Sequence, residues 1–133
     1  MNRIWVVLLL AVFSAIALAT DRPVETLRLL NAATSVSSGT AADRAECEVR
    51  TLQATGTTSS GTGAATIIIE GSNLISPAAG TNVDWVTIGT IVLTLGTTQT
   101  GEGFVSQARW RHIRARVSAI SGTGASVDAY MGC

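Results

Sequence analysis

The sequence predicts an all-β fold, an antiparallel β-sandwich of about seven short strands that follows a hydrophobic N-terminal segment. After residue 19, no stretch carries the apolar stripe of an amphipathic helix. Short β-branched runs recur about every ten residues, and polar loops rich in Gly, Ser and Thr separate them. Thr, Ser, Ala and Gly fill much of the chain, and this composition favours strands and tight turns over helices.

Residues 1–19 have the features of a secretory signal peptide. Arg3 is a positive charge before residues 4–18, which are almost wholly apolar, and residues 17–19 offer the small side chains that a signal peptidase recognises. The apolar run is shorter than the ~20 residues of a membrane span. We therefore expect this segment to be cleaved from a secreted or periplasmic protein, or retained as an anchor or an apolar arm in an assembly. A retained segment would contact a membrane only through residues 4–18.

The remaining chain has room for one domain, with an entry segment at 20–44 and the sandwich at 45–133. The formal net charge is zero, which gives no global attraction to nucleic acid or anionic lipid. All nine basic residues are arginines. The absence of lysine excludes a P-loop and Schiff-base chemistry.

Strands are expected from local patterns. Residues 24–34 form a strand or a short helix, and residues 45–51 alternate as a half-buried strand with Cys47 and Val49 facing inward. Residues 64–72 form an interior strand that Gly71 ends. Residues 83–95 are the longest β-prone run, in which Gly89 predicts a bulge or a turn. Loops are expected at 55–63, 73–82 and 96–103.

The last two strands, 110–120 and 125–132, are predicted to form a hairpin that turns about Thr123. This register pairs apolar residues on one face, namely Ala119 with Val127, Val117 with Ala129, and Ala115 with Met131. The other face then carries Arg114, Arg116, Ser118, Asp128 and Tyr130, and it places Asp128 within reach of an ion pair with Arg116.

The arginine-bearing face of this hairpin is either a solvated strand face or a contact surface for another subunit. The residues that would make the contact are of types enriched at protein interfaces, and they are Trp110, Arg111, Arg114, Arg116 and Tyr130. Neutral net charge and nearby carboxylates argue against nucleic acid as a partner.

The two cysteines, Cys47 and Cys133, both face inward in this scheme, with Cys133 opposite Ile113. Three states remain open: an internal disulfide that closes a long loop, a disulfide to a neighbouring subunit, and two free buried thiols. The spacing fits no zinc motif, and we predict no metal site.

No catalytic constellation stands out, and we predict a protein without enzymatic activity and without a cofactor. His112 is the only imidazole, and the chain has no Gly-x-Ser-x-Gly motif. The Gly-Thr-Gly sequences at 61–63 and 122–124 lie in predicted turns without the βαβ context of a dinucleotide site. A small secreted hydrolase centred on His112 is the weakest alternative.

The stretches "IIIEGSN", "VDWVTIGTI" and "RWRHIRARVSAISGTGASVDAYMG" together resemble small virion proteins of tailed bacteriophages. The residues that match stand within 64–132, and they are Glu70, Gly71, Ser72, Trp85, Gly89 and the run from Arg114 to Gly124. The resemblance implies a structural component of a virion, such as a capsid decoration protein or a head, neck or tail accessory protein. Its partners would be copies of itself or another virion protein.

The apolar N-terminus departs from this family, because tailed-phage virion proteins rarely carry an export signal. The alternative function is therefore an exported β-sandwich module that binds surface carbohydrate or a protein ligand. In that case Trp85 or Trp110 would offer a stacking platform for a sugar ring.

Overall fold

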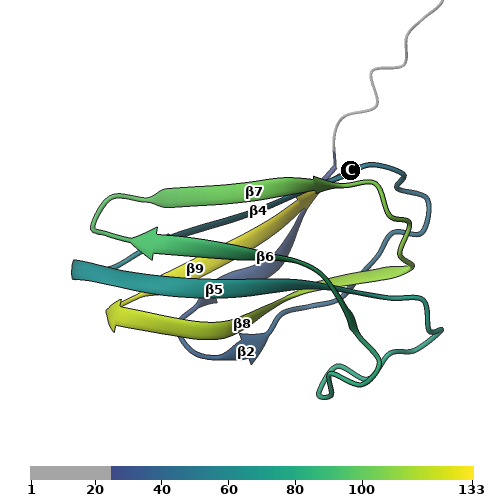
Figure 1. The fold of residues 1–133 in the computed structure, drawn as a ribbon, viewed down its shortest axis with the longest axis horizontal. Coiled ribbons are helices and arrows are strands. Elements are labelled where there is room, and N and C mark those ends of the chain that lie inside the picture. Colours follow the sequence, from purple (N-terminus) through teal and green to yellow (C-terminus); the bar gives the residue numbers. More distant parts are fainter. Residues whose placement is uncertain (1–24) are drawn as a thin grey trace, which may run out of the picture.

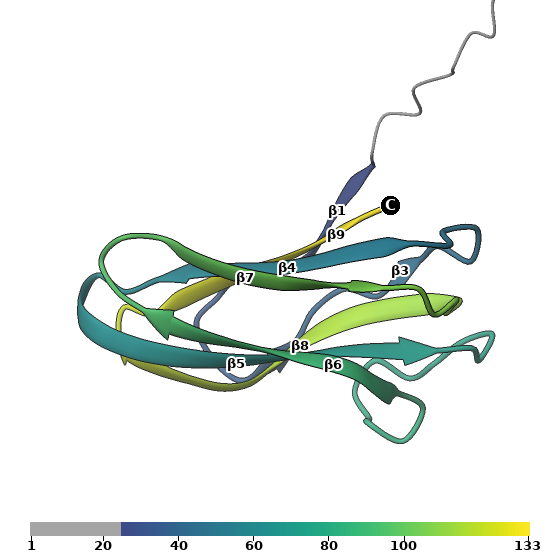
Figure 2. The same ribbon diagram turned by 45° about the horizontal axis from the view of Figure 1, so that its top comes forward.

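The computed structural model describes residues 25–133, which form two antiparallel β-sheets packed face to face (Figures 1 and 2). The predicted β-sandwich is therefore confirmed, and no helix occurs within these residues. The strands are β1 (Thr26–Ala33), β2 (Ser37–Ser38), β3 (Ala42–Asp43), β4 (Arg50–Thr57), β5 (Ser60–Ser72), β6 (Val86–Leu95), β7 (Thr100–Ser106), β8 (His112–Thr123) and β9 (Ser126–Gly132). The predicted segment 1–19 lies outside the described residues.

The two sheets have the strand order of a jelly roll. Sheet A has the order β1-β9-β4-β7, and sheet B has the order β2-β8-β5-β6, with β3 also paired to β8. Taken together, β2 and β3 form one interrupted edge strand, so that each sheet has four strand positions. This arrangement is the eight-stranded sandwich of two Greek keys. Residues of the expected entry segment 20–44 contribute β1, β2 and β3 to it.

Alternating apolar residues of the strands build the core between the sheets. In sheet B, Ile67 and Ile69 of β5 face inward and pack with inward residues of β6 and β8. In sheet A, Leu52 of β4 and Val127 of β9 do the same. Successive side chains of a strand point to opposite faces, so β4, β9 and the second half of β6 bury every second residue against the opposite sheet.

The predicted irregularity at Gly89 is a bulge. The register of β5 and β6 shifts between Ile69, which pairs with Gly89, and Glu70, which pairs with Thr87. A Cβ atom on Gly89 would lie 2.5 Å from the ring of Phe104, so only glycine allows this ring to pack against the strand. The glycine at this bulge thus lets the partly buried Phe104 ring pack against the core.

The predicted hairpin is wrong, although both of its strands exist. β8 pairs with β5 in sheet B, whereas β9 lies between β1 and β4 in sheet A. Val117 is therefore paired with Ile67, and Ala129 with Ala54, and not with each other. Gly124, with φ of 60°, helps turn the chain from one sheet into the other.

The inward direction of most hairpin residues is nevertheless correct. Ala115 and Val117 of β8 and Ala129 and Met131 of β9 are all fully buried. They meet across the core from opposite sheets. Ala119 is the exception and is exposed, because a bulge between it and Val117 shifts the register against β5.

Several boundaries differ from the predictions. The strand expected at 45–51 begins only at Arg50, and the preceding residues form a loop in which Val49 is exposed. The loop expected at 96–103 contains the start of β7, and the loop expected at 55–63 narrows to the residues between β4 and β5. Gly- and Thr-rich runs thus form strands here, because pairing with a neighbouring strand outweighs weak local propensity.

Cys47 and Cys133 form an internal disulfide, which settles the three alternatives in favour of the first. The bridge ties the loop before β4 to the end of β9, and the Cys133 N–H donates to the Glu25 carbonyl at 3.2 Å. The predicted position of Cys133 opposite Ile113 is wrong, because Ile113 lies on β8 in the other sheet. The C-terminus therefore lies beside the start of β1 (Figure 1).

Candidate interaction surface

A buried ion pair lies on the outer face of sheet B. Glu70 of β5 and Arg114 of β8 are cross-strand partners, and Arg114 Nε lies 2.7 Å from Glu70 Oε2. Arg116 binds the other carboxylate oxygen of Glu70 at 3.0 Å. The side chain of Arg114 is only 1% exposed, whereas that of Arg116 is 21% exposed. Another segment of the chain must therefore cover Arg114, because the outer face of a sheet is otherwise exposed to solvent.

The loop between β5 and β6, residues 73–85, provides this cover. Arg114 donates to the carbonyl oxygens of Ala79 (2.6 Å) and Thr81 (3.1 Å) and to Asn82 Oδ1 (2.9 Å). Its guanidinium carbon also lies 4.2 Å from the ring centroid of Trp85. A lysine has no planar fork that could reach an acid and several loop oxygens at once. The hydrogen bonds of Arg114 thus hold this loop against the sheet.

The loop is also held by its own side chains. Trp85 Nε1 donates to the Ala78 carbonyl at 2.9 Å, and the Ala78 N–H donates to Asp84 at 2.8 Å. We call residues 73–85 the pinned loop. Several of its polar groups are thus bonded within the loop or to Arg114, and these bonds fix its backbone without a partner.

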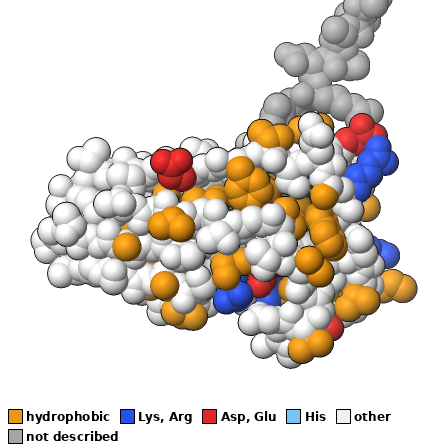
Figure 3. Space-filling view, in the orientation of Figure 1, with side chains coloured by type: hydrophobic (Ala, Val, Ile, Leu, Met, Phe, Trp, Pro, Cys, Tyr) orange, Lys and Arg blue, Asp and Glu red, His pale blue; other side chains and the backbone are white. Residues whose placement is uncertain are grey.

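The pinned loop exposes large aliphatic side chains. Ile75 is 77% exposed and Val83 is 92% exposed, and Leu74 and the adjoining Val86 are also exposed. The run from residue 73 to residue 83 carries no charge. In Figure 3, apolar side chains gather over this part of the molecule, at the lower right. Exposed apolar groups on a fixed loop are typical of a contact surface.

The five residues predicted to form an interface do not share one surface. Arg114 is buried under the pinned loop, and the partly buried Trp110 ring packs against the core, where a Cβ on Gly71 would lie 2.4 Å from it. Tyr130 belongs to sheet A, and its ring centroid lies 5.4 Å from the guanidinium carbon of Arg28. Arg116 is half-buried beside Glu70, and Arg111 is exposed.

The predicted ion pair of Asp128 with Arg116 is also wrong. Asp128 lies in sheet A, where its Oδ1 atom is 3.8 Å from Arg28 Nε. The same oxygen accepts a hydrogen bond from the Ala32 N–H at 3.0 Å. The pairing failed because it depended on β8 and β9 being neighbours in one sheet.

Arg50 is a second buried guanidinium, and the sequence pattern did not identify it. It lies inside the sandwich at the start of β4 and donates to the carbonyls of Ala108 (2.5 Å), Arg44 (2.5 Å) and Trp110 (2.8 Å). Burial lowers the pKa of Arg50, and the nearby Glu46 carboxylate partly opposes this shift. Leu52 and Ala54 face inward on the same strand, and this alternation would have placed Arg50 inside as well.

Arg50→Lys is expected to lower the free energy of unfolding by about 2 kcal/mol, because a single ammonium group leaves buried carbonyls without donors. Urea unfolding followed by circular dichroism measures the change. The control is Arg109→Lys on the exposed surface ion pair with Glu48, which should change stability by less than about 0.5 kcal/mol. Equal effects of the two substitutions would show that the three carbonyl contacts are not important.

Among residues 25–133, the side chain of His112 makes no hydrogen bond to a serine or an acid. Asp43, His112 and Ser72 are successive cross-strand partners on β3, β8 and β5, the residue types of a Ser-His-Asp triad. No hydrogen bond joins them within residues 25–133; the Ser72 hydroxyl is buried and accepts from the Leu74 N–H. The hydrolase alternative therefore gains no supporting contact from this row.

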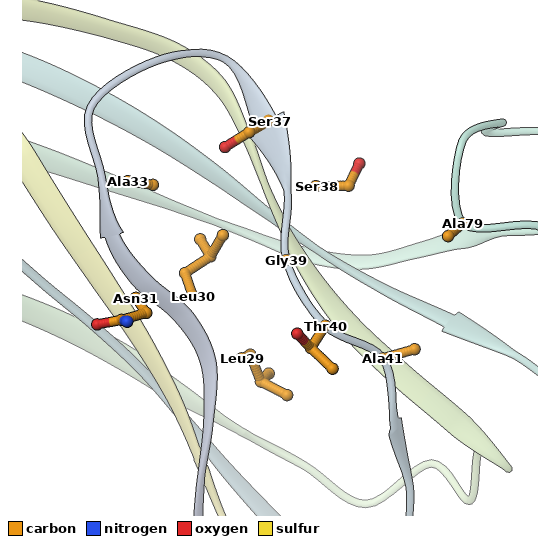
Figure 4. Close-up of a pocket in the computed structure, with 10 residues that line it drawn as sticks. All are labelled: Leu29, Leu30, Asn31, Ala33, Ser37, Ser38, Gly39, Thr40, Ala41 and Ala79. Atoms are coloured by element: carbon orange, nitrogen blue, oxygen red, sulfur yellow. The ribbon is translucent and has the colours of Figure 1, made fainter.

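A shallow cavity of about 510 Å³ lies between β1 and residues 37–41. Figure 4 shows Leu29 and Leu30 between these two segments, with Ala79 of the pinned loop at one side. The residues that line it are small, apolar or uncharged polar ones. The cavity thus offers a ligand hydroxyl and amide groups, and none of its lining side chains is charged.

Residues 25–133 contain no group of three or more His, Cys, Asp or Glu side chains placed to hold a metal ion. They also contain no helix long and apolar enough to cross a membrane.

The chain was also compared with known proteins. No protein-family model, no curated protein and no solved structure matches it.

Proposed function

We propose that this protein is a non-enzymatic structural subunit, a virion-associated protein of the capsid-decoration or head, neck or tail accessory type. It would act through protein–protein contacts made by the pinned loop. The observation that carries the proposal is the loop itself, in which Arg114 fixes a backbone that presents Ile75 and Val83 to solvent.

The energetics of the pinned loop support a contact function. Burying Arg114 and Glu70 costs desolvation free energy, which close pairing and further hydrogen bonds only offset. The result of this arrangement is a rigid loop whose aliphatic side chains remain outside the core. A rigid apolar surface loses little conformational entropy on binding, and this favours association with a partner.

Two features support placing the protein in a virion. The resemblance to tailed-phage virion proteins rests on stretches within residues 64–132, which include residues 73 and 83–85 of the pinned loop. The jelly-roll strand order is one that viral capsid proteins use, although lectins and cupins use it too. Because one fold serves many functions, the fold supports this assignment without selecting it.

The second candidate is an exported binding module. The Cys47–Cys133 disulfide favours it, because disulfides persist in oxidising compartments, and the apolar run at 4–18 fits an export signal. A sugar platform on tryptophan gains no support, since Trp85 is buried and Trp110 is partly buried against the core. An exported module would therefore use the aliphatic residues of the pinned loop.

Ile75→Asp provides the test. In purified particles from a producing culture, the unaltered chain should be incorporated, and Ile75→Asp should lower its incorporation at least about tenfold, because a carboxylate in an apolar contact is desolvated without a partner. Val36→Asp, at a residue of similar exposure on another loop, should be incorporated normally.

Particle-free fractions and intact mass identify the alternative. A chain that is cut after Ala19, stays in the particle-free fraction and is absent from particles contradicts the virion proposal and supports the exported module. Equal incorporation of the Ile75 and Val36 variants would contradict the role of the pinned loop.

A further inference from the structure

β6 is an unprotected edge of sheet B. It pairs only with β5, it has ten residues, and no described strand lies beyond it. The opposite edges are protected: β2 and β3 have two residues each, and β1 has two register shifts and places Ala32 in the left-handed region with φ of 45°. Short or irregular edges resist pairing with other chains, whereas long regular edges invite it.

The composition of β6 adds no other protection. Natural edge strands are commonly blocked by charged residues or proline, and the chain has neither between Asp84 and Glu102. The bulge near Gly89 interrupts the first part of the strand, so the regular edge is the second part. Thr90, Val92 and Thr94 are exposed there on the outer face.

This exposed part of β6 is symmetric in sequence. Residues 90–94 read Thr-Ile-Val-Leu-Thr, so that Val92 has a β-branched or leucine neighbour and then a threonine on each side. We propose that β6 pairs with β6 of a second copy, antiparallel, about a two-fold axis at Val92. The sheets B of two copies would then form one continuous sheet.

The proposed register matches like with like on both faces. Val92 would face Val92 of the second copy, and Thr90 would face Thr94 on the same outer face. Ile91 would lie opposite Leu93 on the core side. β-Branched pairs and Thr–Thr pairs are favourable directly across antiparallel strands. A contact of this kind is isologous and closes as a dimer.

The absence of charge on β6 favours a second copy of this chain as the partner of its edge. A two-fold axis brings each residue near its own equivalent, so any charge close to the axis would meet a like charge. β6 contains none, and this satisfies the condition for self-pairing. One existing contact is compatible: the Thr94 carbonyl accepts from the Thr100 hydroxyl at 3.0 Å, and a carbonyl has a second lone pair.

No strand among residues 25–133 pairs with the outer edge of β6. β6 and β7, the edges of the two sheets, lie on the same side of the sandwich (Figure 2). The pinned loop and its partner are not involved in the proposed contact, so the pairing does not depend on the virion proposal. Self-association and particle incorporation can thus fail separately.

Cysteine cross-linking of the full chain tests the register. The native cysteines are both bonded, so an introduced cysteine supplies the only free thiol. Val92→Cys should form a covalent dimer on mild oxidation, because directly opposite Cα atoms are about 4.5–5.5 Å apart. Thr94→Cys should not, because its equivalent would lie about 13 Å away. Cross-linking that is equal at the two positions, or stronger at Thr94, would overturn the proposal.

Light scattering during size exclusion tests the association itself. The unaltered chain should be a dimer, and Val92→Lys should raise its dissociation constant at least about tenfold by placing two ammonium groups at the axis. Val36→Lys is the matched control, since Val36 is 64% exposed and Val92 is 63% exposed. A monomeric chain at about 100 μM, or equal dissociation constants for the two variants, would refute β6 pairing.

Discussion

Arg114→Ala is expected to lower the free energy of unfolding by about 3–5 kcal/mol, the usual cost of removing one partner of a buried ion pair. The substitution leaves the carbonyls of Ala79 and Thr81 without their donor, and it removes the cation that lies over Trp85. The pinned loop should detach from sheet B as a result. Urea unfolding measures the loss of stability, and limited proteolysis within residues 73–85 measures the detachment.

Arg116→Ala is the matched control for this substitution. Arg116 lies on the same strand and binds the same carboxylate, but it is partly exposed and contacts no residue of the pinned loop through a hydrogen bond. Its removal should cost about 1 kcal/mol or less, and the loop should stay resistant to protease. If both variants lost equal stability and the loop stayed resistant to protease in both, Arg114 would not be the residue that holds the loop against sheet B.

Removal of the disulfide by the double substitution Cys47→Ser and Cys133→Ser should cost about 4–5 kcal/mol. The bridge joins residues 86 positions apart, and in the chain-entropy model a closed loop of this length restricts the unfolded state strongly. The urea midpoint should fall, whereas the slope of the transition reports any change in the surface exposed on unfolding.

Reduction of the unaltered chain should reproduce this effect, and reduction of the double variant should change nothing further. Thiol titration establishes that the bond has opened. If two free thiols appeared while the midpoint stayed unchanged, the bridge would not restrict the unfolded chain, and the entropic account of its contribution would be wrong.

Alternation in the sequence predicted which residues of the last two strands face the core, but it did not predict their partners. Val117 and Val127 are both buried, as expected. The same alternation arises whether two strands lie side by side in one sheet or face each other across the core. The choice depends on long-range pairing with β5 and β4, which no pattern local to residues 110–132 contains.

The site was harder to predict than the core. Arg114 was correctly placed on the outer face of its strand, but its burial depends on a loop 30 to 40 residues earlier in the chain that folds over it. Arg50 illustrates a different failure. Its strand was placed a few residues too early, and that shift moved a buried guanidinium to the predicted solvent face.

The position of the bridge has a mechanical consequence. Thr26, the first residue of β1, pairs with Gly132, the last residue of β9. A force that pulls Glu25 and Cys133 apart would therefore break the hydrogen-bonded pairs between β1 and β9 one after another. The disulfide to Cys47 transmits this force to the loop before β4, so the force does not act on β9 alone. Under such a pull β1 can peel away first, while the remaining strands stay joined as one mechanical unit.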